Sequence, residues 1–180
     1  MPDFRYIGWA EYGNLTEALA EKVRSSKNSF DLVVGIARGG IPVAMVVADR
    51  MGLKVDTMTV KSYSGIAERG PIRILSKLIE DINGKRILLV DDLVDQGDTM
   101  RGVMRILREK GAKEVKTAVL FKKPWSKTDP DFFLEKTEDW IVFPFELREV
   151  NKLRKERGED VQGKSEAGGL AELFKRKESR

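Results

Sequence analysis

Residues 87–100 read Ile-Leu-Leu-Val-Asp-Asp-Leu-Val-Asp-Gln-Gly-Asp-Thr-Met, and this stretch indicates both the fold and the chemistry of the chain. Four consecutive aliphatic residues are typical of a strand that is buried on both faces. Asp91 and Asp92 follow it, and an acidic pair can hold vicinal hydroxyls or a metal ion. The backbone amides of 96–99 and the Thr99 hydroxyl, at the start of a helix, form an anion site suited to phosphate. A phosphorylated sugar satisfies both halves; the alternative is a turn with solvated carboxylates.

The segments around this stretch alternate between strand-like and helix-like patterns. Helices are expected over 9–24, 41–51 and 99–110, and strands over 30–36, 55–60, 86–90, 115–121, 132–134 and 140–143. Residues 61–74 are polar, contain two glycines and a proline, and are expected to form a long mobile loop. This order predicts an α/β fold, a doubly wound, mostly parallel sheet whose ligand lies beyond the carboxyl ends of the strands.

The composition excludes several kinds of chemistry. The chain has 180 residues, which suits about one domain, and it contains neither cysteine nor histidine. Disulfides, thiolate nucleophiles, Ser-His-Asp triads and most zinc sites are therefore ruled out. Any metal is expected to be a hard, oxygen-ligated ion such as Mg2+. Without an 18-residue apolar run or a signal-peptide pattern, the sequence predicts a cytoplasmic protein with no membrane segment.

The net charge of +4 is concentrated at the C-terminal end. Residues 151–180 contain nine basic and six acidic side chains, which leaves 24 basic and 23 acidic residues before them. The nearly neutral body argues against a nucleic-acid partner. We expect 151–180 to be a charged segment, helical to about residue 157 and a loosely held tail beyond it.

The stretch at 87–99 resembles the phosphoribosyl-pyrophosphate (PRPP) motif of the type I phosphoribosyltransferases. In that motif four apolar residues and an acidic pair are followed by two apolar residues and Asp-Thr-Gly-x-Thr. The resemblance implies that Asp91 and Asp92 hold the ribose hydroxyls, directly or through Mg2+, and that Asp95 accepts the N7 proton of a purine. The residues implied in binding the 5-phosphate are Gln96, Gly97, Asp98 and Thr99.

Two residues of this stretch depart from the motif. Gln96 replaces the usual threonine, so that an amide stands in for a hydroxyl donor. Asp98 replaces a residue that is usually small or basic, and it places a negative charge near the phosphate unless its side chain points away.

Two further segments resemble the family in the right order. Arg38 and Gly39, in Ala37-Arg38-Gly39-Gly40, resemble the pyrophosphate loop, where glycines allow the backbone to approach oxygen atoms. The residues that resemble the start of the flexible catalytic loop, and so imply PRPP contacts, are Lys61, Ser62 and Tyr63. Each segment alone would indicate only a turn or a loop.

The base-binding end resembles the hood of the 6-oxopurine phosphoribosyltransferases, in particular the xanthine-guanine type. The similarity lies in Lys122-Lys123-Pro124 and in residues 140–146, Trp-Ile-Val-Phe-Pro-Phe-Glu. It implies that Lys123 donates to the purine O6 and that Trp140 stacks on the ring. The backbone at Ile141 and Val142 would then recognise the opposite edge of the base. On its own, Trp140 would be interpreted as a core or interface aromatic.

The resemblance thus implies a Mg2+-dependent purine salvage enzyme that joins PRPP to guanine, xanthine or hypoxanthine, acting as a homodimer or homotetramer. Residues 1–150 would be the phosphoribosyltransferase domain, with the base-binding hood near 122–146. Three alternatives remain open: a regulatory protein that senses PRPP or a nucleotide, a phosphoribosyltransferase for adenine or a pyrimidine, and an inactive nucleotide binder.

Overall fold

The structure is a computed structural model, and it describes residues 3–64, 69–156 and 158. The chain forms two compact units. The sheet unit is Gly13–Glu138, and the terminal unit combines Met1–Tyr12 with Asp139–Arg180.

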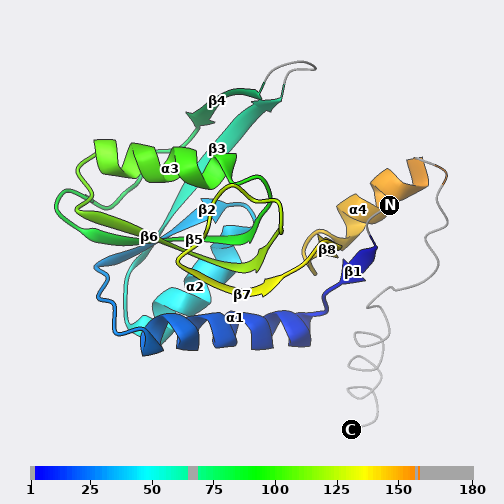
Figure 1. Ribbon diagram of the computed structural model, residues 1–180, viewed down its shortest axis with the longest axis horizontal. Helices are drawn as coiled ribbons and strands as arrows, with labels where there is room; N and C mark the ends of the chain where they lie inside the picture. Colours follow the sequence, from blue (N-terminus) through cyan, green and yellow to red (C-terminus); the bar gives the residue numbers. More distant parts are fainter. Residues whose placement is uncertain (1–2, 65–68, 157, 159–180) are drawn as a thin grey trace, which may run out of the picture. The chain divides into compact units, whose positions relative to one another are not determined.

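The sheet unit is built on six strands in the order β4-β3-β2-β5-β6-β7 (Figure 1). Their bounds are β2 Leu32–Ala37, β3 Val55–Ser64, β4 Arg69–Ile74, β5 Arg86–Val94, β6 Glu114–Lys122 and β7 Phe132–Lys136. All neighbouring strands are parallel except β3 and β4. The predicted doubly wound, mostly parallel sheet is therefore confirmed.

Helices cover both faces of this sheet. They are α1 Trp9–Ser25, which begins in the terminal unit, α2 Gly40–Met51 and α3 Asp98–Glu109. Figure 1 shows α3 on one face of the sheet and α2 and α1 on the other. The apolar side of α3 buries Met100, Val103 and Leu107 in one core with β5 and β6 residues such as Leu89 and Val119. Burying such a side chain stabilises the fold by about 1.5–3 kcal/mol.

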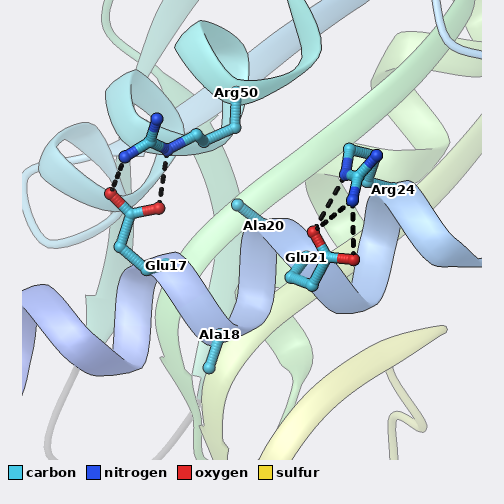
Figure 2. Close-up of a pocket in the computed structure, with 6 residues that line it drawn as sticks. All are labelled: Glu17, Ala18, Ala20, Glu21, Arg24 and Arg50. Atoms are coloured by element: carbon cyan, nitrogen blue, oxygen red, sulfur yellow. Dashed lines mark hydrogen bonds and ion pairs between the residues drawn. The ribbon is translucent and has the colours of Figure 1, made fainter.

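Ion pairs join α1 to α2 and brace α1 itself (Figure 2). Glu17 accepts two hydrogen bonds from Arg50, at 2.6 Å from Nε and 2.5 Å from Nη2. Glu21 accepts from Arg24 of the same helix at 2.9 Å. These pairs line a surface hollow of about 480 Å³. Because its charged groups pair with one another, the hollow presents no net charge to a ligand.

Within the described residues, the terminal unit holds a two-stranded parallel sheet, the start of α1 and a further helix. β1 Phe4–Tyr6 pairs with β8 Trp140–Val142, and α4 runs over Leu147–Glu156. Tyr12 anchors the unit, because its ring meets those of Phe143 and Phe145 edge-on at 5.9 and 5.6 Å. The helix predicted up to about residue 157 is present as α4, and the predicted tail lies outside the described residues except for Gly158.

The prediction of a long loop over 61–74 is wrong for most of its length. β3 continues to Ser64 and pairs antiparallel with β4, with Val60 opposite Ile74 and Ser62 opposite Ile72. The prediction relied on polarity and on Pro71, but β4 is an edge strand, where a missing N–H is tolerated. Backbone pairing at an edge does not require an apolar run.

β5 is also longer than predicted, since it continues to Val94 alongside β6. Asp91 and Asp92 therefore lie within the last part of the strand instead of following it. In the part of the chain that the structure describes, no helix has both the length and the apolar character needed to span a membrane.

Candidate active site at the carboxyl end of the sheet

The predicted pyrophosphate loop lies directly against the acidic pair. β2 and β5 are neighbours, and the loop between β2 and α2 crosses the end of β5. A β-carbon added at Gly39 would lie 1.9 Å from Asp92 Oδ2, and one at Gly40 would lie 2.5 Å from the Val90 carbonyl oxygen. Only glycine fits at such distances, so the two segments that resemble the family separately are in contact. The peptide bond between Ala37 and Arg38, which opens this loop, is cis.

The acidic pair is half-buried and held by its own backbone. Asp91 Oδ1 accepts the Asp92 N–H at 3.0 Å, and Asp92 Oδ1 accepts the Leu93 N–H at 2.6 Å. Burial of the carboxyl group, and then the adjacent negative charge of Asp92, raise the pKa of Asp91 well above its usual value.

Two adjacent carboxylates are a suitable donor set for Mg2+, which is usually held by one or two carboxylates together with substrate oxygens and water. Over 3–64, 69–156 and 158, no cluster of three or more acidic, histidine or cysteine side chains offers a fuller metal site. Asp91 and Asp92 thus fit a Mg2+ ion that takes its remaining ligands from substrate oxygens and water.

The predicted phosphate loop turns through Gly97 into α3. Gly97 has a φ of 84° and is buried, and a β-carbon there would lie 2.1 Å from Thr128 Oγ1. α3 begins at Asp98, with Thr99 in its first turn. Glycine provides no side-chain cap, so the first amides of α3 and its positive dipole end are suited to an anion.

The charge of Asp98 is balanced by Arg101, one turn further along α3. The Arg101 guanidinium forms an ion pair with the Asp98 carboxylate, and it also donates to Thr128 Oγ1 at 3.4 Å. The departure from the family motif at Asp98 therefore comes with its own counter-ion. Arg101 was not among the residues predicted from the sequence, although a spacing of three residues in a helix is typical of such ion pairs.

The loop after β6 runs alongside the end of β5 and the phosphate loop, and hydrogen bonds join it to both. The Lys123 N–H donates to the Val94 carbonyl at 2.9 Å, and the Lys127 N–H donates to the Gln96 carbonyl at 3.3 Å. The Thr128 hydroxyl donates to the Gly97 carbonyl at 3.1 Å. The predicted base-recognition loop and the predicted phosphate loop are thus one connected structure.

Asp95 and Lys123 both contact Trp125, a residue that the sequence reasoning missed. Asp95 is exposed, and its Oδ1 accepts a hydrogen bond from the Trp125 indole N–H at 2.6 Å. The Lys123 Nζ lies 5.5 Å from the centre of the Trp125 ring, and the lysine is only 7% exposed. Lys122 forms an ion pair with Asp129 instead. The sequence signal was weak: one tryptophan in an otherwise polar loop.

The terminal unit contains three of the predicted base-binding residues, Trp140, Ile141 and Val142. Trp140 is 55% exposed, whereas Ile141 and Val142 are buried. The Val142 carbonyl accepts the Ile7 N–H at 3.0 Å, so part of the backbone predicted to recognise the base also bonds to the N-terminal segment. The Trp140 ring lies 6.2 Å from that of Phe4, which leaves an indole surface open to solvent.

The three residues predicted to open the catalytic loop lie in β3. Lys61 pairs with Arg73, and Ser62 with Ile72, through the backbone. The side chains of Lys61, Ser62 and Tyr63 lie outside the described part of the structure.

Comparison with known proteins agrees with this geometry. A family model described as the phosphoribosyl transferase domain matches residues 8–150. The chain belongs to this family. Among its relatives in the phosphoribosyltransferase family, the xanthine-guanine phosphoribosyltransferase of Cereibacter sphaeroides is 31% identical over 149 residues. That match covers 79% of this chain and 86% of the relative.

Two further matches support membership of the phosphoribosyltransferase family. The xanthine-guanine phosphoribosyltransferase of Idiomarina loihiensis is 28% identical over 144 residues, which are 79% of this chain and 86% of the relative. The crystal structure of purine phosphoribosyltransferase from Pyrococcus horikoshii Ot3 has a TM-score of 0.71 and 35% sequence identity. The match covers 79% of this chain and 93% of the Pyrococcus horikoshii chain.

Proposed function

We propose that the protein is a purine salvage enzyme that transfers the 5-phosphoribosyl group of PRPP to a 6-oxopurine, namely guanine, xanthine or hypoxanthine. The observation that supports this most strongly is the contact of the Gly39 loop with the carboxylate of Asp92. It joins a suitable site for pyrophosphate to a suitable site for ribose hydroxyls. The relatives named for xanthine-guanine and purine substrates support the choice of base.

PRPP would lie across the carboxyl ends of β2 and β5. Asp91 and Asp92 would hold the ribose hydroxyls, and residues 96–99 would bind the 5-phosphate through their amides. Arg38 and Gly39 would hold the pyrophosphate, together with Lys61, Ser62 and Tyr63. Mg2+, held by Asp91 and Asp92, would supply positive charge that balances the negative charge of the phosphates.

The reaction forms a bond between C1′ and the purine N9 while the bond from C1′ to pyrophosphate oxygen breaks, its electron pair leaving with pyrophosphate. The purine N7 proton then has to be accepted. In a chain without histidine a carboxylate is the natural acceptor, and Asp95 fills this role. The tasks left to the protein are positioning and charge balance.

Two side chains would select the base. The Lys123 ammonium can only donate, so it favours the 6-keto oxygen of a 6-oxopurine over the 6-amino group of adenine. Trp140 would offer the exposed face of its indole to the purine ring, and the backbone at Ile141 and Val142 would recognise the opposite edge. The resemblance also implies a homodimer or homotetramer.

The decisive test is nucleotide formation from Mg-PRPP with hypoxanthine, guanine, xanthine, adenine and uracil offered separately. Turnover confined to 6-oxopurines is expected. Turnover with adenine or uracil alone would overturn the assignment of the base. PRPP binding without turnover on any base would favour a PRPP- or nucleotide-sensing regulatory protein instead.

A further inference from the structure

Trp125 contacts the two side chains to which the proposed reaction assigns proton transfer and base selection. Its indole N–H donates to Asp95 Oδ1 at 2.6 Å, and its ring centre lies 5.5 Å from the Lys123 Nζ. A tryptophan that served only to fill the core would be buried. Trp125 is 46% exposed, so water could satisfy its N–H, yet the N–H is directed at a carboxylate.

The backbone around Trp125 is fixed on both sides. Lys123 is bonded to Val94 at 2.9 Å, and Thr128 to Gly97 at 3.1 Å. The Ser126 N–H also bonds back to the Lys123 carbonyl at 3.0 Å, which closes a tight turn around residue 125. The indole is therefore presented to Asp95 from a braced loop.

The hydrogen bond distinguishes the two oxygens of Asp95. Oδ1 is occupied by the indole, and among the described residues none donates a hydrogen bond to Oδ2. An exposed aspartate without such a partner samples several rotamers, and each rotamer directs its oxygens differently. The contact with Trp125 restricts this choice and leaves one oxygen available to accept a proton.

We propose that Trp125 is a positioning residue that orients Asp95 through its indole N–H, and that its ring face holds the ammonium of Lys123. This inference rests on the proposed function, since it assigns Asp95 and Lys123 their roles. A tryptophan ring attracts an ammonium that lies within about 6 Å of its centre, so the Trp125 ring favours one position of the Lys123 Nζ. Trp125 thereby joins recognition of O6 to removal of the N7 proton.

The test is a double-mutant cycle with Trp125→Phe and Asp95→Asn, measured as kcat and as separate KM values for PRPP and guanine. Trp125→Phe should lower kcat about 10- to 100-fold, the scale of a misplaced reacting group, with the KM for PRPP within about twofold. When Asp95→Asn is already present, adding Trp125→Phe should lower kcat almost no further, because the effect of Trp125 on kcat acts through Asp95. Replacing Trp125 by 3-benzothienylalanine, which keeps the ring shape without the N–H, should reproduce the loss of kcat while the KM for guanine stays unchanged.

Trp9→Phe is the matched control, because Trp9 is also an exposed tryptophan, and it should leave kcat unchanged. An activity-independent readout uses the three indole N–H signals of the ¹⁵N-labelled protein. The signal that Trp125→Phe removes should move when Asp95 becomes asparagine. A stationary signal, an unchanged kcat in Trp125→Phe, or equal losses in both backgrounds would overturn the inference. A wild-type protein inactive on every base would instead overturn the proposed function.

Discussion

Gly39 and Asp92 are so close that a β-carbon at position 39 would lie 1.9 Å from the Asp92 Oδ2. We predict that Gly39→Ala displaces either the loop or the carboxylate, and so raises the KM for PRPP at least tenfold. Gly13→Ala is the control, because nothing lies within 4 Å of the added carbon in the interior of α1. Alanine is the better helix former there and should stabilise the fold by about 0.5–1 kcal/mol. An equal KM for PRPP in both variants would show that the loop does not contact substrate.

Substitutions at Asp95 and at Lys123 should impair different kinetic constants. Asp95→Asn keeps the size of the side chain but removes the proton acceptor, so kcat should fall by about 100-fold or more with little change in PRPP binding. Lys123→Ala should weaken the use of guanine and hypoxanthine much more than the binding of PRPP. Steady-state kinetics with each substrate varied in turn separates the two. Normal turnover by Asp95→Asn, or equal loss of base and PRPP binding in Lys123→Ala, would contradict the assigned roles.

The sequence predicted the centre of the sheet well because each signal there is local. The aliphatic run before Asp91 is typical of a buried strand, and Gly39 and Gly97 mark the turns that follow strands. The errors lie where neighbours decide the structure. The edge strand β4 is held by backbone pairing to β3, and the alternation in its sequence is limited to Ile72-Arg73-Ile74, too short a signal to predict a strand. The role proposed for Trp125 depends on its hydrogen bond to Asp95, which is 30 residues away. The hydrophobic periodicity of a sequence cannot indicate a contact between residues so far apart.

Asp56 is a structural carboxylate whose removal should destabilise the fold. It is 7% exposed and accepts three backbone N–H bonds, from Thr57 at 2.7 Å, Ile79 at 2.7 Å and Glu80 at 2.9 Å. Asp56→Ala leaves three donors without their acceptor, so we expect a loss of about 2–4 kcal/mol in the free energy of unfolding. Urea unfolding measures it. The exposed Asp49→Asn, on α2, should change the value by less than about 0.5 kcal/mol. If Asp56→Ala changed the free energy of unfolding by a similarly small amount, water would have replaced the carboxylate as the acceptor for the three N–H groups.

The pair of Asp31 and Arg86 should make stability depend on pH in the acid range. The Arg86 side chain, and then its backbone N–H, hydrogen bond to Asp31 and lower the pKa of that carboxyl below its usual value. A lowered pKa in the folded state stabilises the fold fully above the unfolded value of about 3.9, and this contribution is lost as the pH falls from there through the lowered folded pKa. The Tm of Asp31→Asn should thus be lower than that of the wild type at pH 6, and the difference should shrink progressively as the pH falls below about 4. A constant difference across this range would contradict the assignment.

Phe4 supports the ring that is predicted to stack on the base. Its ring lies 6.2 Å from that of Trp140, and on β1 it is paired in register with Trp140 on β8. The Arg154 guanidinium lies 4.5 Å from the centre of the Phe4 ring and donates to the Tyr6 hydroxyl at 2.5 Å. An aromatic contact of this kind is worth about 0.5–1.5 kcal/mol beyond its buried area, or about 2- to 10-fold in binding.

We therefore predict that Phe4→Leu raises the KM for guanine about 2- to 10-fold while the KM for PRPP stays constant. Leucine keeps an apolar side chain in β1 but removes the ring against which Trp140 and Arg154 pack. Leu153→Ala, which changes an exposed residue of α4 next to Arg154, should alter neither KM. If the KM for PRPP rose in parallel in Phe4→Leu, the effect would be general misfolding. If the KM for guanine stayed constant, the Phe4 ring would not be needed to hold Trp140 in position for stacking on the base.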